Sequence, residues 1–188
     1  MANPFTKLGF GYGPPDPTCP PPTYELFVEL VPSTSWGANL RSILPKADWD
    51  KLRKNCYRLA GYRCEICGGK GPKHPVECHE VWEYEEIDYV EGASLPEGGL
   101  TYIQTLKGLI ALCPACHEVK HFGLASLRGR DKQALDHLMR VNGWGFTKAI
   151  EHIDEMQRLW GQRSAFGWEL DLFWLEEQGV EIPTPPED

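Results

Sequence analysis

Two CxxC pairs constrain the fold of this chain more than any other feature of its sequence. Cys64 and Cys67 form the first pair, Cys113 and Cys116 form the second, and 45 residues lie between them. Four thiolates can surround one zinc ion as a tetrahedral cage, which leaves no coordination position for water. The sequence therefore predicts a structural Zn²⁺ that holds the middle of the chain folded. The alternative is four buried free thiols.

The rest of the composition favours a metalloprotein over a disulfide-linked one. The cysteines number seven, which is odd, and the N-terminal residues show no export signal, so cross-links are not expected. No apolar run approaches the roughly 18 to 20 residues that span a bilayer. We therefore expect a cytoplasmic protein of one domain with appendages and no membrane partner.

The pattern of apolar residues predicts an α+β fold. The expected elements are, in chain order, a strand at 24–31, a helix from Trp49 to about Ala60 with Asp48 as its N-cap, a hairpin at 76–82 and 101–113, a helix opened by PACHEVKH, and two helices at 131–141 and 146–164. The acidic segment 83–99 is expected to be irregular, whereas 168–179 fits either a strand or a helix.

These elements divide the chain into five segments. They are a Pro-rich arm (1–23), an N-terminal strand and linker (24–48), a zinc-bound core (49–125), a helical C-terminal extension (126–182) and a tail (183–188). The segment 49–125 contains both CxxC pairs and most of the residues that suggest chemistry.

Cysteines and histidines alternate along the chain in three segments. In order, these are CEIC (64–67), VECHEV (76–81) and, after a spacer, LIALCPACHEVKH (109–121). This order resembles the zinc-stabilised HNH endonuclease family over about residues 49–125. The resemblance implies a ββα-metal core and a second divalent metal, such as Mg²⁺ or Mn²⁺. In that family the metal polarises the scissile phosphate while a histidine base activates water.

The resemblance assigns candidate roles to particular residues. His79 matches the first metal ligand and His117 the last, with His121 one helical turn later as a further ligand. Glu80 stands where the family has its general-base histidine. If His79 were the base instead, Cys78 would become the ligand, which a hard magnesium ion would reject.

The family's middle asparagine has no counterpart here: no Asn lies between residues 79 and 117, and the matching position falls near Gly108. The sequence therefore predicts His79, Glu80 and His117 as candidate catalytic residues of a partly degenerate motif. Non-catalytic roles stay open for two of them: His79 as a core histidine bonded to backbone, and His117 as an outer partner of the cysteine thiolates.

The charge of the chain limits how it can meet nucleic acid. The net charge is −8 and the sequence pI is about 5.3, so any phosphate contact must be local. The predicted contact surface comprises basic residues around the two CxxC pairs: Lys51, Lys54, Arg58, Arg63, Lys70, Lys73, Lys120, Arg128 and Arg130. An acidic stretch at 77–97, with eight Asp or Glu, would oppose that contact.

Three functions are compatible with these features. The first, which we favour from sequence, is a catalytically degenerate HNH-like module that binds DNA, RNA or a protein partner, for example in phage–host conflict. The second is an active metal-dependent HNH endonuclease. The third is an acidic interaction protein that blocks a nucleic-acid-binding partner.

Overall fold

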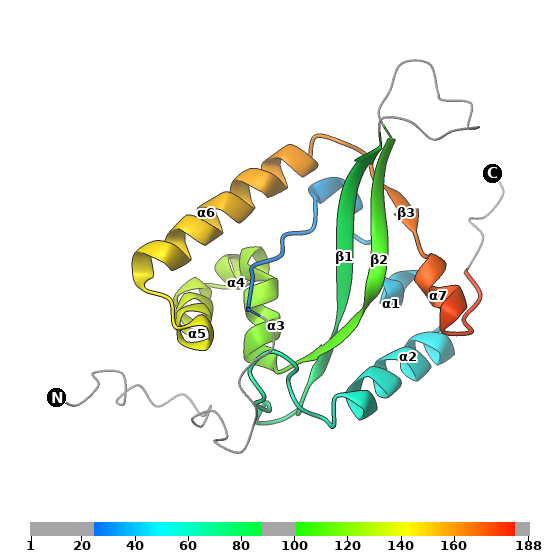
Figure 1. Cartoon of the computed structure of the whole chain (residues 1–188), viewed down its shortest axis with the longest axis horizontal. Coiled ribbons are helices and arrows are strands. Elements are labelled where there is room, and N and C mark those ends of the chain that lie inside the picture. Colours follow the sequence, from blue (N-terminus) through cyan, green and yellow to red (C-terminus); the bar gives the residue numbers. More distant parts are fainter. Residues whose placement is uncertain (1–24, 88–100, 183–188) are drawn as a thin grey trace.

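The computed structural model describes residues 25–87 and 101–182, which form a mixed α+β fold (Figure 1). The elements are η2 (Ser33–Ser35), α1 (Leu40–Ile43), α2 (Lys46–Leu59), β1 (Glu77–Ile87), β2 (Thr101–Leu112), α3 (Pro114–Lys120), α4 (Phe122–Leu127), α5 (Asp131–Asn142), α6 (Phe146–Arg163), β3 (Glu169–Asp171) and α7 (Phe173–Glu177). The Pro-rich arm, the tail and most of the acidic stretch lie outside the described residues.

The sheet has the strand order β1-β2-β3, with β1 antiparallel to β2 and the short β3 parallel to β2. The register pairs His79 with Ile110 and shifts between Val81 and Trp82. Gly108, opposite Val81, has a φ of +153°, a conformation that side chains disfavour. This bulge lies two positions from His79 along the strand pair.

Two hydrophobic clusters lie on either side of the long hairpin (Figure 1). The first is formed by α3 to α6 and the N-terminal segment, with Val119, Leu138 and Ile153 buried in it. The second is formed by α1, α2 and α7, with Leu52 and Leu175 buried in it. Side chains alternate across a strand, so neighbouring residues of β1 face different clusters.

The prediction of a strand at 24–31 is wrong. Residues 25–32 form no ladder with the sheet but run along the helices of the first cluster. The backbone N–H of Glu29 donates to the Lys120 carbonyl at 2.9 Å, and other backbone groups bond to helix side chains. We call residues 25–32 the N-terminal strap.

Other boundaries also differ from the prediction. Helix α2 begins three residues before Trp49, with Pro45 at its N-cap, so Asp48 lies in the first turn and is not the cap. Strand β1 extends to Ile87, so the first part of the segment expected to be irregular is regular strand. The ambiguous segment near the C-terminus contains both β3 and α7. The helices predicted after the second CxxC pair are confirmed.

Candidate metal centres

The four CxxC cysteines lie together as predicted. Their Sγ atoms are all within 4.8 Å of one another, which is close enough to bind one metal ion. The Sγ atoms of Cys67 and Cys113 are 3.6 Å apart, far longer than a disulfide bond of about 2.05 Å. Two thiolates about 2.3 Å from a tetrahedral zinc ion would be separated by about 3.8 Å, so the observed spacing suits such an ion.

Local backbone structure brings the two pairs together. In the first pair, the N–H of Gly68 donates to the Cys64 carbonyl at 2.8 Å, and Gly68 has a φ of +70° that favours glycine. Glu65 joins this turn to the end of β2, because its N–H donates to the Ala111 carbonyl and its carboxylate accepts from the Ala111 N–H. In the second pair, Pro114 occupies the first turn of α3.

A buried histidine lies beside the cysteine cluster. His137 of α5 has its Nε2 atom 3.1 Å from the Cys116 Sγ atom, and its Nδ1 atom is 2.6 Å from Arg140. Burial, followed by the charge of Arg140, lowers the pKa of His137 to about 4. The thiols of Cys113 and its neighbours hold the pKa of Cys64 well below its usual range. The sequence alone assigns no metal-binding role to His137, because no motif in its helix marks it.

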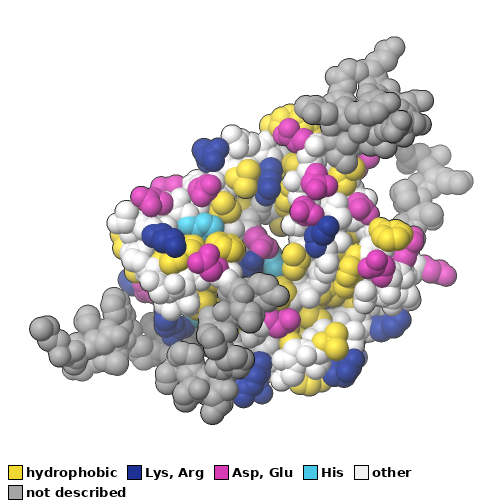
Figure 2. Space-filling view, viewed as in Figure 1, with side chains coloured by type: hydrophobic (Ala, Val, Ile, Leu, Met, Phe, Trp, Pro, Cys, Tyr) yellow, Lys and Arg dark blue, Asp and Glu magenta, His cyan; other side chains and the backbone are white. Residues whose placement is uncertain are grey.

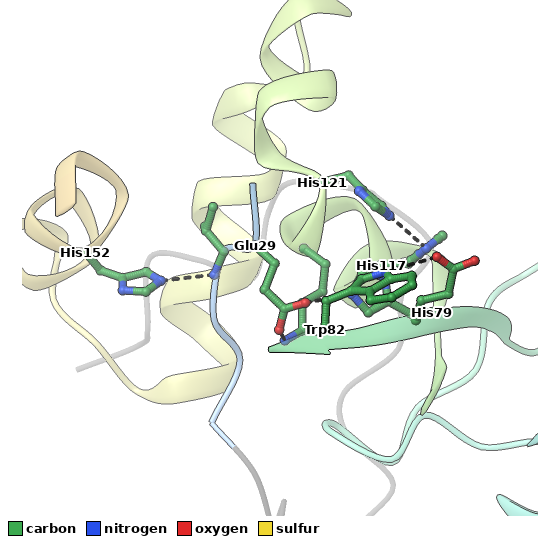
Figure 3. A network of polar contacts seen from close by, with 9 residues as sticks. Glu29, His79, Trp82, His117, His121 and His152 are labelled. Carbon is green, nitrogen blue, oxygen red and sulfur yellow. Dashed lines mark hydrogen bonds and ion pairs between the residues drawn. The ribbon is translucent and has the colours of Figure 1, made fainter. Parts of the chain in front are cut away.

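A second cluster consists of His79, His117 and His121, whose ligand atoms also lie within 4.8 Å of one another. His79 comes from β1, His117 from α3 and His121 from the junction of α3 and α4 (Figure 3). The Nε2 atoms of His117 and His121 are 3.2 Å apart. Imidazole nitrogens about 2.0–2.1 Å from a tetrahedral ion would be about 3.3 Å apart, so this pair can share one cation.

Glu77 fixes the orientation of His117. Its Oε2 atom accepts a hydrogen bond from the His117 Nδ1 atom at 2.5 Å, while the His117 Nε2 atom lies next to His121. Such a carboxylate partner raises the basicity of a metal-binding imidazole. The hydrogen bond from His117 lowers the pKa of Glu77. Sequence could have identified Glu77, because strand residues two apart share a face and Glu77 precedes His79 by two.

Glu29 makes the corresponding contact with His79. Its Oε2 atom lies 2.8 Å from the His79 Nε2 atom, and its other oxygen pairs with the buried ammonium of Lys120. Burial alone would raise the pKa of Glu29, but the bond from His79 and the charge of Lys120 lower it to about 2. Burial lowers the pKa of His79. Burial and the nearby His117 together lower the pKa of His121 to about 3. Neutral imidazole is the form that binds metal, so the lowered pKa values of His79 and His121 favour a metal site.

Glu80 does not join the histidine cluster. As the residue after His79 on β1, its side chain projects to the other face of the sheet. There its two oxygens accept hydrogen bonds from the Leu40 N–H at 2.8 Å and from the Trp82 indole at 3.1 Å. Burial raises its pKa. Cys78 shares that face and packs beside Cys56, so neither residue supports the role that the sequence reading considered for it.

The donor set of the histidine cluster restricts the metal. Imidazole nitrogens suit zinc, nickel, copper and iron, whereas magnesium prefers oxygen ligands. Within the described residues, the histidine cluster offers three nitrogens and no carboxylate oxygen close to all of them. A cation bound there would keep coordination positions open, unlike a cation in the closed cysteine cage.

The predicted basic surface is only partly retained. The prediction that Lys120 lies on this surface is wrong, because Lys120 is buried and paired with Glu29. Arg130 pairs with Glu118 at 2.6 Å. On α2, however, Lys51, Lys54 and Arg58 are exposed and line one open groove together with Tyr62. Figure 2 shows basic side chains scattered among acidic ones elsewhere on the visible face.

Comparisons with protein-family models, with curated proteins and with solved structures found no match. Among the described residues, no helix is long and apolar enough to cross a membrane.

Proposed function

We propose that this protein is an HNH-like metalloprotein that acts on nucleic acid. In this proposal the cysteine cluster holds a structural zinc ion, and the histidine cluster holds one divalent cation for phosphodiester hydrolysis. The observation that carries the proposal is the group of three imidazoles from β1 and α3–α4, with Glu77 bonded to His117.

The two clusters would have different tasks. The cysteine cluster joins the turn after α2 to the start of α3, so it fixes the helix that carries His117. The element order β1, β2, α3, with His79 on β1 and His117 on α3, supports the proposal of an HNH-like ββα core. A cation in the histidine cluster would polarise a phosphodiester and lower the pKa of a bound water. His79, His117 and His121 would hold it, while Glu77 and Glu29 would orient the rings.

A second candidate is binding without cleavage, and the position of Glu80 favours it. Glu80 is the carboxylate that the sequence suggests as a base. Its oxygens accept hydrogen bonds from Leu40 and Trp82 on the opposite face of the sheet from the histidines. The groove on α2 would then provide phosphate contacts, because Lys51, Lys54 and Arg58 line it without an acidic neighbour in the lining.

Plasmid nicking separates the two candidates. Zinc-loaded protein is incubated with supercoiled DNA and with structured RNA in nickel, cobalt, zinc, manganese or magnesium, against a chelator. Hydrolysis predicts cleavage that is stronger with nickel or cobalt than with magnesium and is lost in His117→Ala. His74→Ala is the matched control, since His74 is exposed and lies outside both clusters. Absence of cleavage in every metal from folded protein would contradict hydrolysis.

Binding is measured on the same proteins by fluorescence anisotropy across a salt series. A triple change of Lys51, Lys54 and Arg58 to Glu should weaken binding and flatten its salt dependence. The control changes Lys132, Lys148 and Arg158 to Glu, which alters the net charge equally on α5 and α6. Equal weakening by both triples would contradict a specific role for the α2 groove.

A further inference from the structure

The contacts of Glu29 extend the proposed metal centre beyond the segment that resembles the HNH family. Glu29 belongs to the N-terminal strap, about 50 residues before His79 in sequence. Its carboxylate lies between His79 and the buried Lys120. Figure 3 shows Glu29 beside the histidines of the cluster. Glu29 does not belong to the group of mutually close ligand atoms. It therefore contacts the cluster from outside and is not one of its ligands.

The partners of Glu29 determine what it does to His79. The Oε1 atom of Glu29 pairs with the buried ammonium of Lys120, so the ionised carboxylate can only accept a hydrogen bond through its Oε2 atom. The His79 Nε2 atom must therefore carry the proton, and Nδ1 keeps the lone pair. The ammonium of Lys120 balances the charge of Glu29 in a site where an unpaired carboxylate would be costly.

The strap itself is held by α5 and α6. The Asn142 side chain accepts from the Leu26 N–H at 2.8 Å and donates to the Leu26 carbonyl at 2.7 Å, as a neighbouring strand would. The His152 Nε2 atom accepts from the Val28 N–H at 3.0 Å, and the Trp160 indole donates to the Val31 carbonyl at 3.0 Å. These contacts precede and follow Glu29, so the two helices fix the position of its carboxylate.

We propose that the N-terminal strap completes the metal centre, with Glu29 as the positioning residue that sets the tautomer and orientation of His79, and with α5 and α6 acting as the support that holds the strap in place. This inference rests on the proposed divalent-cation site at the histidines. It gives the C-terminal helices a role in metal binding, although they supply no ligand.

Metal affinity tests the proposal without measuring activity. Zinc-loaded protein is titrated with Co²⁺, and the visible absorption of cobalt reports binding at the histidine cluster. Glu29→Gln should weaken cobalt binding by about 10- to 100-fold, the usual cost of losing an outer partner. Glu25→Gln is the matched control, because Glu25 is an exposed glutamate of the same strap. Asn142→Ala should weaken cobalt binding in the same direction, from a residue that touches no histidine of the cluster.

Nitrogen NMR of the wild-type protein reports directly which ring nitrogen of His79 carries the proton, and it needs no variant. The proposal expects His79 as the Nε2–H tautomer both without a cation at the histidine cluster and with zinc bound there. A proton on Nδ1 in the loaded protein would overturn it. Unchanged cobalt affinity in Glu29→Gln and Asn142→Ala would overturn it as well.

The two levels of the hypothesis fail differently. If the wild-type protein takes up no second equivalent of metal, the proposed function is wrong. If it takes up the second equivalent and the strap variants match wild type, only the role of the strap is wrong.

Discussion

At the scale of single residues, Gly71 shows how tightly the two cysteine segments are packed. A Cβ atom at this position would lie 2.2 Å from the His74 carbonyl oxygen and 2.5 Å from the Pro114 Cδ atom. We expect Gly71→Ala to reduce the free energy of unfolding by at least about 1–3 kcal/mol, the usual cost of overpacking. Urea denaturation of the metal-loaded protein measures the change.

Gly161 in α6 supplies the matched control for this substitution. A Cβ atom there meets no heavy atom within 4 Å, and the residue is helical. Gly161→Ala should therefore stabilise the protein by about 0.5–1 kcal/mol, because alanine favours a helix more than glycine does. Stability changes of the same sign in both variants would contradict the packing argument for Gly71.

The residues of the two candidate metal centres differ in how far the sequence could identify them. The cysteines and His117 stand in local spacings whose chemistry is specific, so their clustering could be predicted. Glu77 follows from strand alternation once His79 is placed. Glu29 could not be predicted, because its partner lies about 50 residues away and no local pattern links the two.

At the scale of elements, the N-terminal strap shows which part of the strand prediction holds and which part does not. Leu26 and Val28 are buried and Phe27 is exposed, so the period of two that predicted a strand is real. That period reports an extended backbone with one buried face, and it does not identify the hydrogen-bond partner. Here the partners are Asn142 and His152 on helices. The same limit left the segment 168–179, which contains β3 and α7, unresolved from sequence.

The bond between His152 and the strap makes stability depend on pH. Burial lowers the pKa of His152, and only its neutral form can accept from the Val28 N–H. The unfolded chain binds this proton at a higher pH than the native protein does. The contribution of His152 is therefore complete above about pH 6.5, and it is lost as the pH falls through that value toward the lower native pKa.

His152→Gln isolates this contribution, because glutamine keeps an acceptor but does not titrate. Urea denaturation near pH 7.5 and near pH 5.5 should show a smaller acid-induced loss of stability in the variant than in wild type. His121 and His137 also have lowered pKa values, and their effects are common to both proteins. Equal losses in the two proteins would show that His152 does not titrate in this window.

At the scale of the whole molecule, the hairpin lies between two hydrophobic clusters, and only the first contains cysteines of the CxxC pairs. The first cluster contains Cys64, Cys113 and Cys116 beside residues of α3 to α6. The second, around Leu52 and Leu175, contains none of these cysteines. The cysteine site therefore belongs to the packing of one side of the sheet only.

Removal of the proposed zinc should consequently unfold the molecule unevenly. Metal bound to four thiolates contributes its binding free energy to folding, and that contribution is lost on chelation. Hydrogen exchange followed by mass spectrometry, before and after treatment with a strong chelator under reducing conditions, should show protection lost first in 64–69 and in α3 to α6. The amides of α2 and α7 should lose protection later, and added zinc should restore both sides. A uniform loss would indicate a single cooperative core, and unchanged protection would show that the cysteine cluster does not need a metal.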